Sequence, residues 1–155
     1  MGKDNRSLEE LIEDVLGYNN PGEKELKRYF RELGIKYEDV TNNCKYWGKD
    51  IDFITPAATI EVKWDSKLSA TGNIFIETVS NTEKDKPGWF NICEADLIYY
   101  GDAVNKLFYI FKREQLAKYI EENKDNLKVK TAPDYYRGRV VKHSKGYVIP
   151  VKDLE

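Results

Sequence analysis

Two short runs of the sequence place acids and a base at a spacing that could support hydrolysis. In the run 59–63, alternate side chains of a strand share a face, so Glu61 and Lys63 project together while the aliphatic residues between them point into a core. A Thr-Pro-Ala-Ala turn at 55–58 separates this run from Asp52. If the turn folds the two runs as neighbouring strands, Asp52 comes beside Glu61, and two carboxylates share a patch with one ammonium.

The chemistry of such a patch favours a metal ion. Two carboxylates without other partners repel, and a hard divalent ion such as Mg²⁺ relieves the repulsion while it keeps several waters. The ion lowers the pKa of a bound water and neutralises phosphate charge, and a nearby lysine orients the water. The pattern therefore predicts phosphodiester hydrolysis with Mg²⁺, for which Mn²⁺ should substitute. A plain salt bridge on a strand also fits the fragment, because 34% of the residues are charged.

The same residues resemble the motif of the PD-(D/E)XK nuclease superfamily, in which a hairpin joins an acid on one strand to acid-x-lysine on the next. Asp52, Glu61 and Lys63 match that motif. Upstream, residues 21–35 look like the N-terminal helix of the archaeal Holliday-junction resolvases, with Glu23 at the position of their helix glutamate. The resemblance implies that Asp52, Glu61 and Glu23 hold the metal ion and that Lys63 positions the attacking water.

Three further acids are candidates for the same site. Glu25 replaces Glu23 if the helix register slips by two residues, and either acid also fits an exposed charge near the helix N-terminus. Asp50 shares a strand face with Asp52, so it is a candidate for supporting the metal ligands or for replacing one. Glu77 could hold a water near the metal from a neighbouring strand, or it could face solvent.

The resemblance covers residues 21–64 and leaves the subfamily open. No proline precedes Asp52, and the run 71–77 followed by Ala95-Asp96 looks more like phage-type and restriction-type relatives. The expected function is a Mg²⁺-dependent DNA endonuclease that selects branched DNA, or a sequence-specific enzyme of restriction or homing type. An inert nucleic-acid-binding member of the fold and an unrelated α/β interaction domain are the alternatives from other classes.

Basic and aromatic residues mark three candidate nucleic-acid surfaces. They are the polar face of the second helix, the loop at 80–94, and a strip at 128–145 that holds six Lys or Arg against a single acid. The residues are Lys24, Arg28, Lys84, Lys86, Trp89, Arg137, Arg139 and Lys142. Because one small site must cut two antiparallel strands of duplex DNA, a homodimer is expected.

Composition bounds the class of protein. At 155 residues the chain is the size of a single domain, 1–155, and no stretch approaches the roughly 20 apolar residues of a membrane span. No signal or transit peptide pattern opens the chain, so we expect a cytoplasmic protein, in the host cytoplasm if a phage encodes it. Cys44 and Cys93 form no C-x-x-C pair, and His143 is the only histidine, which disfavours disulfides and zinc. No membrane partner and no small-molecule cofactor are expected.

Periodicity and turn residues give the elements that must position these side chains. Helices are predicted at 7–17, 23–33 and 112–123. Strands are predicted at 35–40, 51–55, 59–64, 74–79, 95–100, 106–111, 127–131, 139–142 and 147–151, with a long surface loop at 80–94. The order describes an α/β domain with a mixed central sheet flanked by helices, and the resemblance implies a restriction-endonuclease-like αβββαβ core.

Overall fold

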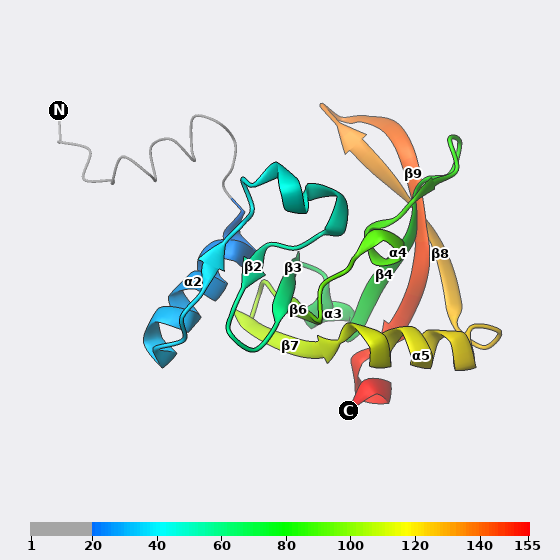
Figure 1. The fold of residues 1–155 in the computed structure, drawn as a ribbon. Helices are drawn as coiled ribbons and strands as arrows, with labels where there is room; N and C mark the ends of the chain where they lie inside the picture. Colours follow the sequence, from blue (N-terminus) through cyan, green and yellow to red (C-terminus); the bar gives the residue numbers. More distant parts are fainter. Residues whose placement is uncertain (1–19) are drawn as a thin grey trace, which may run out of the picture.

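The computed structural model describes residues 20–155 (Figure 1). The predicted hairpin lies at the centre of its first sheet. Its strands lie in the order β1, β2, β3, β6, β7, and β3 runs parallel to β6 while the other pairs are antiparallel. The strands are β1 (Glu38–Asp39), β2 (Phe53–Ile54), β3 (Thr59–Asp65), β6 (Leu97–Asp102) and β7 (Leu107–Lys112). The sheet is therefore mixed, as predicted.

A second sheet takes up strands that were expected in the first one. All of its pairs are antiparallel, and the strand order is β5, β4, β9, β8. The strands are β4 (Asn73–Asn81), β5 (Lys86–Pro87), β8 (Lys128–Tyr136) and β9 (Arg139–Pro150). The two short strands predicted at 139–142 and 147–151 are one strand, because pairing with both β4 and β8 keeps the polar residues between them extended.

Helix α2 begins and ends where the sequence provides capping signals. The side chain of Asn20 accepts hydrogen bonds at the start of α2 (Pro21–Leu33), and Gly34, with φ of 69°, ends it. The prediction of a helix at 23–33 is confirmed, and α5 (Arg113–Asn123) confirms the prediction at 112–123. The helix predicted at 7–17 lies outside the described residues.

Short helices occupy three connections between strands and follow the last strand. They are the 3₁₀ turn η1 (Cys44–Lys49), α3 (Leu68–Thr71), α4 (Trp89–Ile92) and the 3₁₀ turn η2 (Val151–Leu154). The prediction of one surface loop at 80–94 is wrong in part, because β5 and α4 lie within it and Phe90 is buried. The polar composition of the segment concealed its buried residues, Phe90 and Cys93.

Apolar side chains cover both faces of the first sheet. Leu26 and Phe30 of α2 pack on one face, against Ile60, Val62 and neighbouring rings. The other face meets a larger cluster that joins the second sheet, α4 and α5: Leu68, Ile74, Ile76, Phe90, Ile98, Tyr100, Leu116, Ile120, Ile149 and Val151. Strand β3, which carries the candidate site, is therefore enclosed from both sides. Within residues 20–155 no helix combines the length and apolar character needed to cross a bilayer.

The packing between the sheets makes a first prediction about stability. Ile76 on β4 is 0% exposed in the cluster between the layers, so Ile76→Ala should lower the free energy of unfolding by about 2–5 kcal/mol. Ile110 on β7 is 52% exposed, so Ile110→Ala should cost about 1 kcal/mol or less. Urea unfolding followed by circular dichroism measures both, and equal losses would contradict a core between the two sheets.

Candidate active site

The hairpin that was predicted to bring Asp52 beside Glu61 is present. Strands β2 and β3 pair in antiparallel register, and the backbone N–H of Thr55 closes the turn by donating to the carbonyl of Ala58 at 2.9 Å. The ladder continues past the two-residue strand β2, since the N–H of Asp52 donates to the carbonyl of Ile60 at 2.8 Å. Backbone pairing thus fixes the position of Asp52.

Asp52, Glu61 and Lys63 form a continuous chain of polar contacts. One oxygen of Asp52 accepts a hydrogen bond from the backbone N–H of Val62 at 2.9 Å, and its carboxyl also contacts the carboxyl of Glu61. Nζ of Lys63 lies 2.8 Å from Oε1 of Glu61. The structure therefore brings together the three residues of the sequence motif.

Burial shifts the pKa values of this cluster, in which acids outnumber bases. Glu61 is 4% exposed, and burial raises its pKa to about 9, against the opposing effect of Lys63. Burial also raises the pKa of Asp52, although the Val62 N–H opposes it. Burial disfavours the charged form of Lys63, but the carboxylates of Glu61, Asp50 and Asp52 more than offset this and raise its pKa. Three acids thus share one ammonium.

Asp50 supplies the third acid from an unusual backbone position. It ends η1 with φ of 48°, in the left-handed region. Its Oδ2 is buried and has no hydrogen-bond partner within the described part of the chain, and burial raises the pKa of the carboxyl. An orphaned buried oxygen beside two other carboxyls is a feature of a site that a cation would complete.

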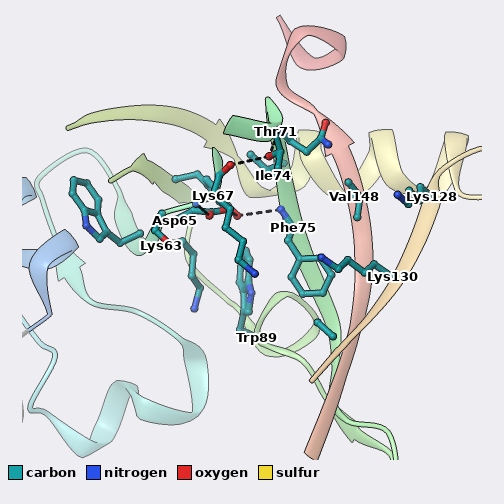
Figure 2. Close-up of a pocket in the computed structure, with 15 residues that line it drawn as sticks. Lys63, Asp65, Lys67, Thr71, Ile74, Phe75, Trp89, Lys128, Lys130 and Val148 are labelled. Atoms are coloured by element: carbon teal, nitrogen blue, oxygen red, sulfur yellow. Dashed lines mark hydrogen bonds between the residues drawn. The ribbon is translucent and has the colours of Figure 1, made fainter. Parts of the chain in front are cut away.

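Glu77 of the second sheet and Trp89, the first residue of α4, lie beside this cluster. The carboxylate of Glu77 on β4 accepts a hydrogen bond from the backbone N–H of Trp89, and burial raises the pKa of Glu77 while Lys142 and Lys63 oppose the shift. Nζ of Lys63 lies 4.5 Å from the centroid of the Trp89 ring (Figure 2). A Cβ on Gly88 would lie 2.5 Å from the carbonyl of Glu77, so glycine permits this close approach.

The helix acids lie on another side of the sheet. Helix α2 packs on the face of β3 formed by Ile60 and Val62, whereas Glu61 and Lys63 project from the opposite face. Glu25 pairs with Arg28 on the same helix. The charges that most affect the pKa values of Glu61 and Lys63 are those of the pair itself, Asp50 and Asp52. The metal-binding role of Glu23 stays a prediction.

A cleft of about 460 Å³ opens beside Lys63, between the first sheet and the second. Lysines from both layers line it, together with Phe75 and Trp89 (Figure 2). The lysines are Lys63, Lys67, Lys128 and Lys130. Sequence reasoning did not single out the last three, although the alternation Lys128-x-Lys130 on a strand indicated that two of them share a face.

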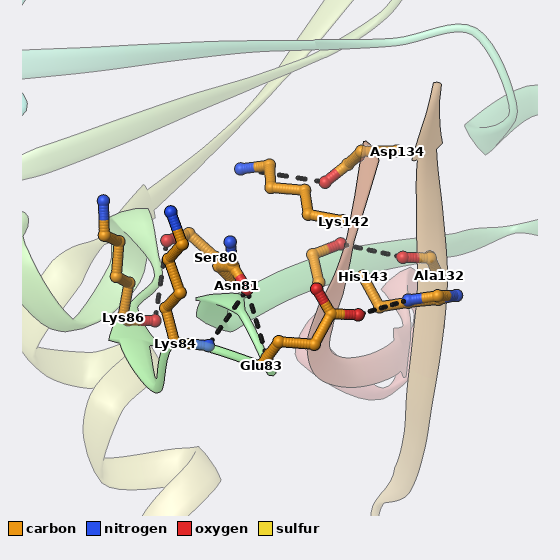
Figure 3. Close-up of polar contacts among 10 residues, drawn as sticks. Ser80, Asn81, Glu83, Lys84, Lys86, Ala132, Asp134, Lys142 and His143 are labelled. Carbon is orange, nitrogen blue, oxygen red and sulfur yellow. Dashed lines mark hydrogen bonds and ion pairs between the residues drawn. The ribbon is translucent and has the colours of Figure 1, made fainter. Parts of the chain in front are cut away.

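Two of the predicted nucleic-acid surfaces meet at one end of the second sheet. The loop between β4 and β5 contacts β9, since the N–H of Thr82 donates to the carbonyl of His143 at 2.9 Å and Glu83 lies 3.2 Å from Nδ1 of His143. Figure 3 shows the side chains of Lys84 and Lys86 extending side by side, and that of Lys142 running in another direction with its ammonium beside Asp134.

The remaining predicted contacts divide between two places. Arg137 and Arg139 flank the exposed turn between β8 and β9, where Arg137 stacks on Tyr136 at 5.3 Å. Lys24 and Arg28 belong to α2, on the face of the first sheet away from the second, and Arg28 is paired with Glu25 and Glu32. The α2 surface is therefore separate from the other two.

Known proteins give no further guide to these residues. Comparison of the chain with protein-family models, with curated proteins and with solved structures gives no match. Within residues 20–155, no three His, Cys, Asp or Glu side chains form a group that could hold a metal ion as they stand. Asp52 and Glu61 are instead engaged with the Val62 N–H and with Lys63, so their oxygens face internal donors.

The second prediction concerns the thiol beneath the site. Sγ of Cys93 lies 3.8 Å from the carbonyl of Asp50, Cys93 is 2% exposed, and burial raises its pKa from 9.0 to about 11. This higher pKa leaves about 100-fold less of Cys93 as thiolate at pH 8. Cys93 should therefore react with iodoacetamide at least about 100-fold more slowly than the exposed Cys44. Peptide mass spectrometry measures both rates. Equal rates in the folded protein, with urea-unfolded protein as the reference, would contradict the packing under Asp50.

Proposed function

We propose that this chain is a Mg²⁺-dependent nuclease of PD-(D/E)XK type that hydrolyses phosphodiester bonds in DNA. The observation that carries the proposal is the buried contact of 2.8 Å between Lys63 and Glu61, with Asp52 on the other side of Glu61. These residues lie next to a cleft lined with lysines. An acid pair, a lysine and a basic cleft are the parts that phosphodiester hydrolysis requires.

The arrangement of the elements also supports the proposal. After α2, β1, β2 and β3 the chain passes through α3, β4 and β5 and then through α4 and β6, and the sheet order β1, β2, β3, β6 places β6 parallel to β3. With α3, β4 and β5 taken as an insertion, these elements follow the αβββαβ order that the superfamily resemblance implies. Two strands of the second sheet, β4 and β5, lie between β3 and β6 in the sequence. The second sheet therefore adds to such a core and leaves the pairing of β3 with β6 intact.

The donor set fits Mg²⁺. Asp52 and Glu61 offer hard carboxylate oxygens, and Asp50 adds a buried oxygen without a partner among the described residues. Mg²⁺ is often held by only one or two carboxylates together with waters and substrate phosphates, so a ready group of three acids is not a requirement. When bound, the ion would supply positive charge at the phosphate and acidify the attacking water.

The protein's own groups orient the reactants. Glu61 and the Trp89 ring hold the ammonium of Lys63 from two sides, so its position is fixed at the edge of the cleft. From there Lys63 can donate hydrogen bonds to the attacking water or to a phosphate oxygen as negative charge develops. The water oxygen forms the new bond to phosphorus, and the ester P–O bond opposite it breaks.

The third prediction tests the motif directly. Lys63→Met, Asp52→Asn and Glu61→Gln should each lower the cleavage rate by at least about 100-fold, because each removes a group acting at the reacting phosphate. Labelled linear duplex, single-stranded and four-way-junction DNA would be incubated with Mg²⁺, Mn²⁺ or EDTA. The matched control is Lys118→Met on α5, whose side chain is 74% exposed.

Either outcome of this assay is decisive. Cutting that requires Mg²⁺ or Mn²⁺ and is lost in the motif variants, but kept in the control, would support the nuclease. A folded wild-type protein that cuts none of these substrates, and that binds no Mg²⁺ in calorimetry, would refute it. The preferred substrate would separate a junction-selective enzyme from a restriction or homing type, and gel filtration would test the expected homodimer.

The fourth prediction concerns the acid that supports the metal site. Glu77 interacts with Lys63, whereas α2 lies on the other face of β3, so we assign the supporting role to Glu77 rather than to Glu23. Glu77→Gln should weaken both cleavage and Mg²⁺ affinity by about 10- to 100-fold. Glu23→Gln should change neither by more than about 3-fold.

Calorimetric titration with Mg²⁺ separates this role from a purely structural one. A variant that only destabilises the fold lowers the melting temperature without a matching change in Mg²⁺ affinity at low temperature. A larger loss of affinity in Glu23→Gln than in Glu77→Gln would return the supporting role to the helix acid.

One observation favours a second candidate function, a protein that binds nucleic acid without cutting it. The acids of residues 20–155 do not form a ready group for a metal ion, and burial raises the pKa of Glu61 to about 9. Such a site could persist in a binding protein of the same fold. DNA binding without cleavage in every metal tested would select this alternative.

A further inference from the structure

The cleft beside Lys63 carries more positive charge than the rest of its lining can balance. Of its four lysines, Lys63 is paired with Glu61, and no ion pair involves Lys67, Lys128 or Lys130 within residues 20–155. The carboxylate in the lining, Asp65, already accepts hydrogen bonds from the hydroxyl of Tyr100 at 2.6 Å and from the N–H of Lys67 at 2.7 Å. The cleft is therefore suited to an anion.

Strand register explains why these side chains share one surface. Val148 on β9 pairs with Phe75 on β4 and with Lys128 on β8, so the three side chains form a row across the second sheet. In the adjacent row Gly146 pairs with Glu77 and with Lys130. Side chains from three neighbouring strands thus share one face of the second sheet, while Ile74, Ile76 and Ile149 project from its other face into the core.

Aromatic rings lie among the lysines. Figure 2 shows Lys63 and Lys67 extending toward Trp89, with the Phe75 ring nearby and Lys130 reaching toward it from the second sheet. A basic groove with aromatic surfaces is the arrangement by which proteins hold single-stranded nucleic acid, with lysines along the backbone and bases stacked on rings. An acidic peptide would use the lysines but would leave the rings without a matching partner.

The size and depth of the cleft limit what can enter. Its volume of about 460 Å³ is in the range of sites for single small ligands, so the cleft can admit one nucleotide but not the width of a duplex. Glu61 is 4% exposed and the side chain of Lys63 is 28% exposed, so a phosphate must leave the outer surface and enter the cleft to reach them. One strand separated from its partner can do this.

We propose that the cleft between the two sheets binds a single strand of nucleic acid, with one unstacked nucleotide against Phe75 and Trp89 and its phosphates on Lys67, Lys128 and Lys130. The inference deepens the proposed function by naming the substrate form, and it rests on that function only for the role of Lys63. Unpaired DNA, or DNA locally opened at a junction or flap, is the substrate class.

Binding measured without catalysis tests the proposal. Fluorescence anisotropy in EDTA would compare a labelled oligothymidine of about 12 nucleotides with a hairpin duplex of similar length. The wild-type protein should bind the single strand at least about 10-fold more tightly. Lys128→Ala/Lys130→Ala should weaken that binding by at least about 10-fold, and should reduce the magnitude of the slope of log K against log[salt] by about 1.4.

The matched control removes the same number of positive charges at a place outside the cleft. Lys118→Ala/Lys124→Ala removes one lysine of α5 and one at its C-terminal cap. The ammonium groups of these lysines pair with Glu122 and Glu121, and the double variant should leave the affinity within about 2-fold. Phe75→Leu should weaken single-strand binding by about 10-fold through lost stacking. Circular dichroism checks that each variant is folded, and Lys130→Gln serves as a milder substitution of an exposed residue.

Duplex binding as tight as single-strand binding, or equal losses in the cleft and control variants, would overturn the proposal. If cleavage of duplex DNA persisted while the cleft variants bound normally, the nuclease would stand and the cleft would be wrong. If single-strand binding depended on the cleft lysines but no metal supported cleavage, the cleft would stand and the nuclease would be wrong.

Discussion

Glu61 and Lys63 lie 2.8 Å apart on a strand whose two faces are both covered, and the surrounding structure must offset the cost of burying them. Removing a carboxylate or an ammonium from water costs several kcal/mol for each ion before their mutual attraction is counted, which is why burial raises the pKa of Glu61 to about 9. Leu26 and Phe30 cover β3 from one side, and the larger apolar cluster between the sheets covers it from the other. Both layers are therefore needed to keep this pair in place. The same enclosure gives the pair its use, because charges interact more strongly where water is excluded.

The two sheets make different contributions to the site. The first sheet positions the acids through backbone pairing, since the ladder between Asp52 and Ile60 fixes one carboxyl and alternation along β3 fixes the other. The second sheet positions the lysine, because α4 packs against β4 and presents the Trp89 ring to Nζ of Lys63. Neither layer alone would form the arrangement. Relative movement of the sheets would separate Lys63 from Trp89 and would change the width of the cleft.

The parts that local signals specify could be predicted from the sequence, and the parts that distant pairing specifies could not. Apolar periodicity at 23–33, a glycine at 34 and alternation at 59–63 each act within a few residues, so α2 and the hairpin were predicted, although the cap at Asn20 starts α2 two residues earlier than predicted. The second sheet depends on pairing between β4 and β9, which lie about seventy residues apart in the sequence, so no local pattern reveals it. Lys128 and Lys130 belong to the predicted basic strip at 128–145, but the cleft that they line together with Lys67 could not be predicted for the same reason, since it forms only after the sheets have packed.

The balance of charges argues that the site serves a ligand rather than stability. A buried ion pair that only holds the fold together needs one acid for each base, and apolar residues of similar volume often stabilise a fold equally well or better. Here Asp50, Asp52 and Glu61 all act on one lysine, and an oxygen of Asp50 is buried without a partner among the described residues. Each surplus carboxyl destabilises the protein unless something cationic joins it. Perturbed acids that lie beside a cleft are characteristic of functional sites. The excess of acids within the site and of lysines in the cleft would both be balanced by a divalent cation bound together with a nucleic-acid phosphate.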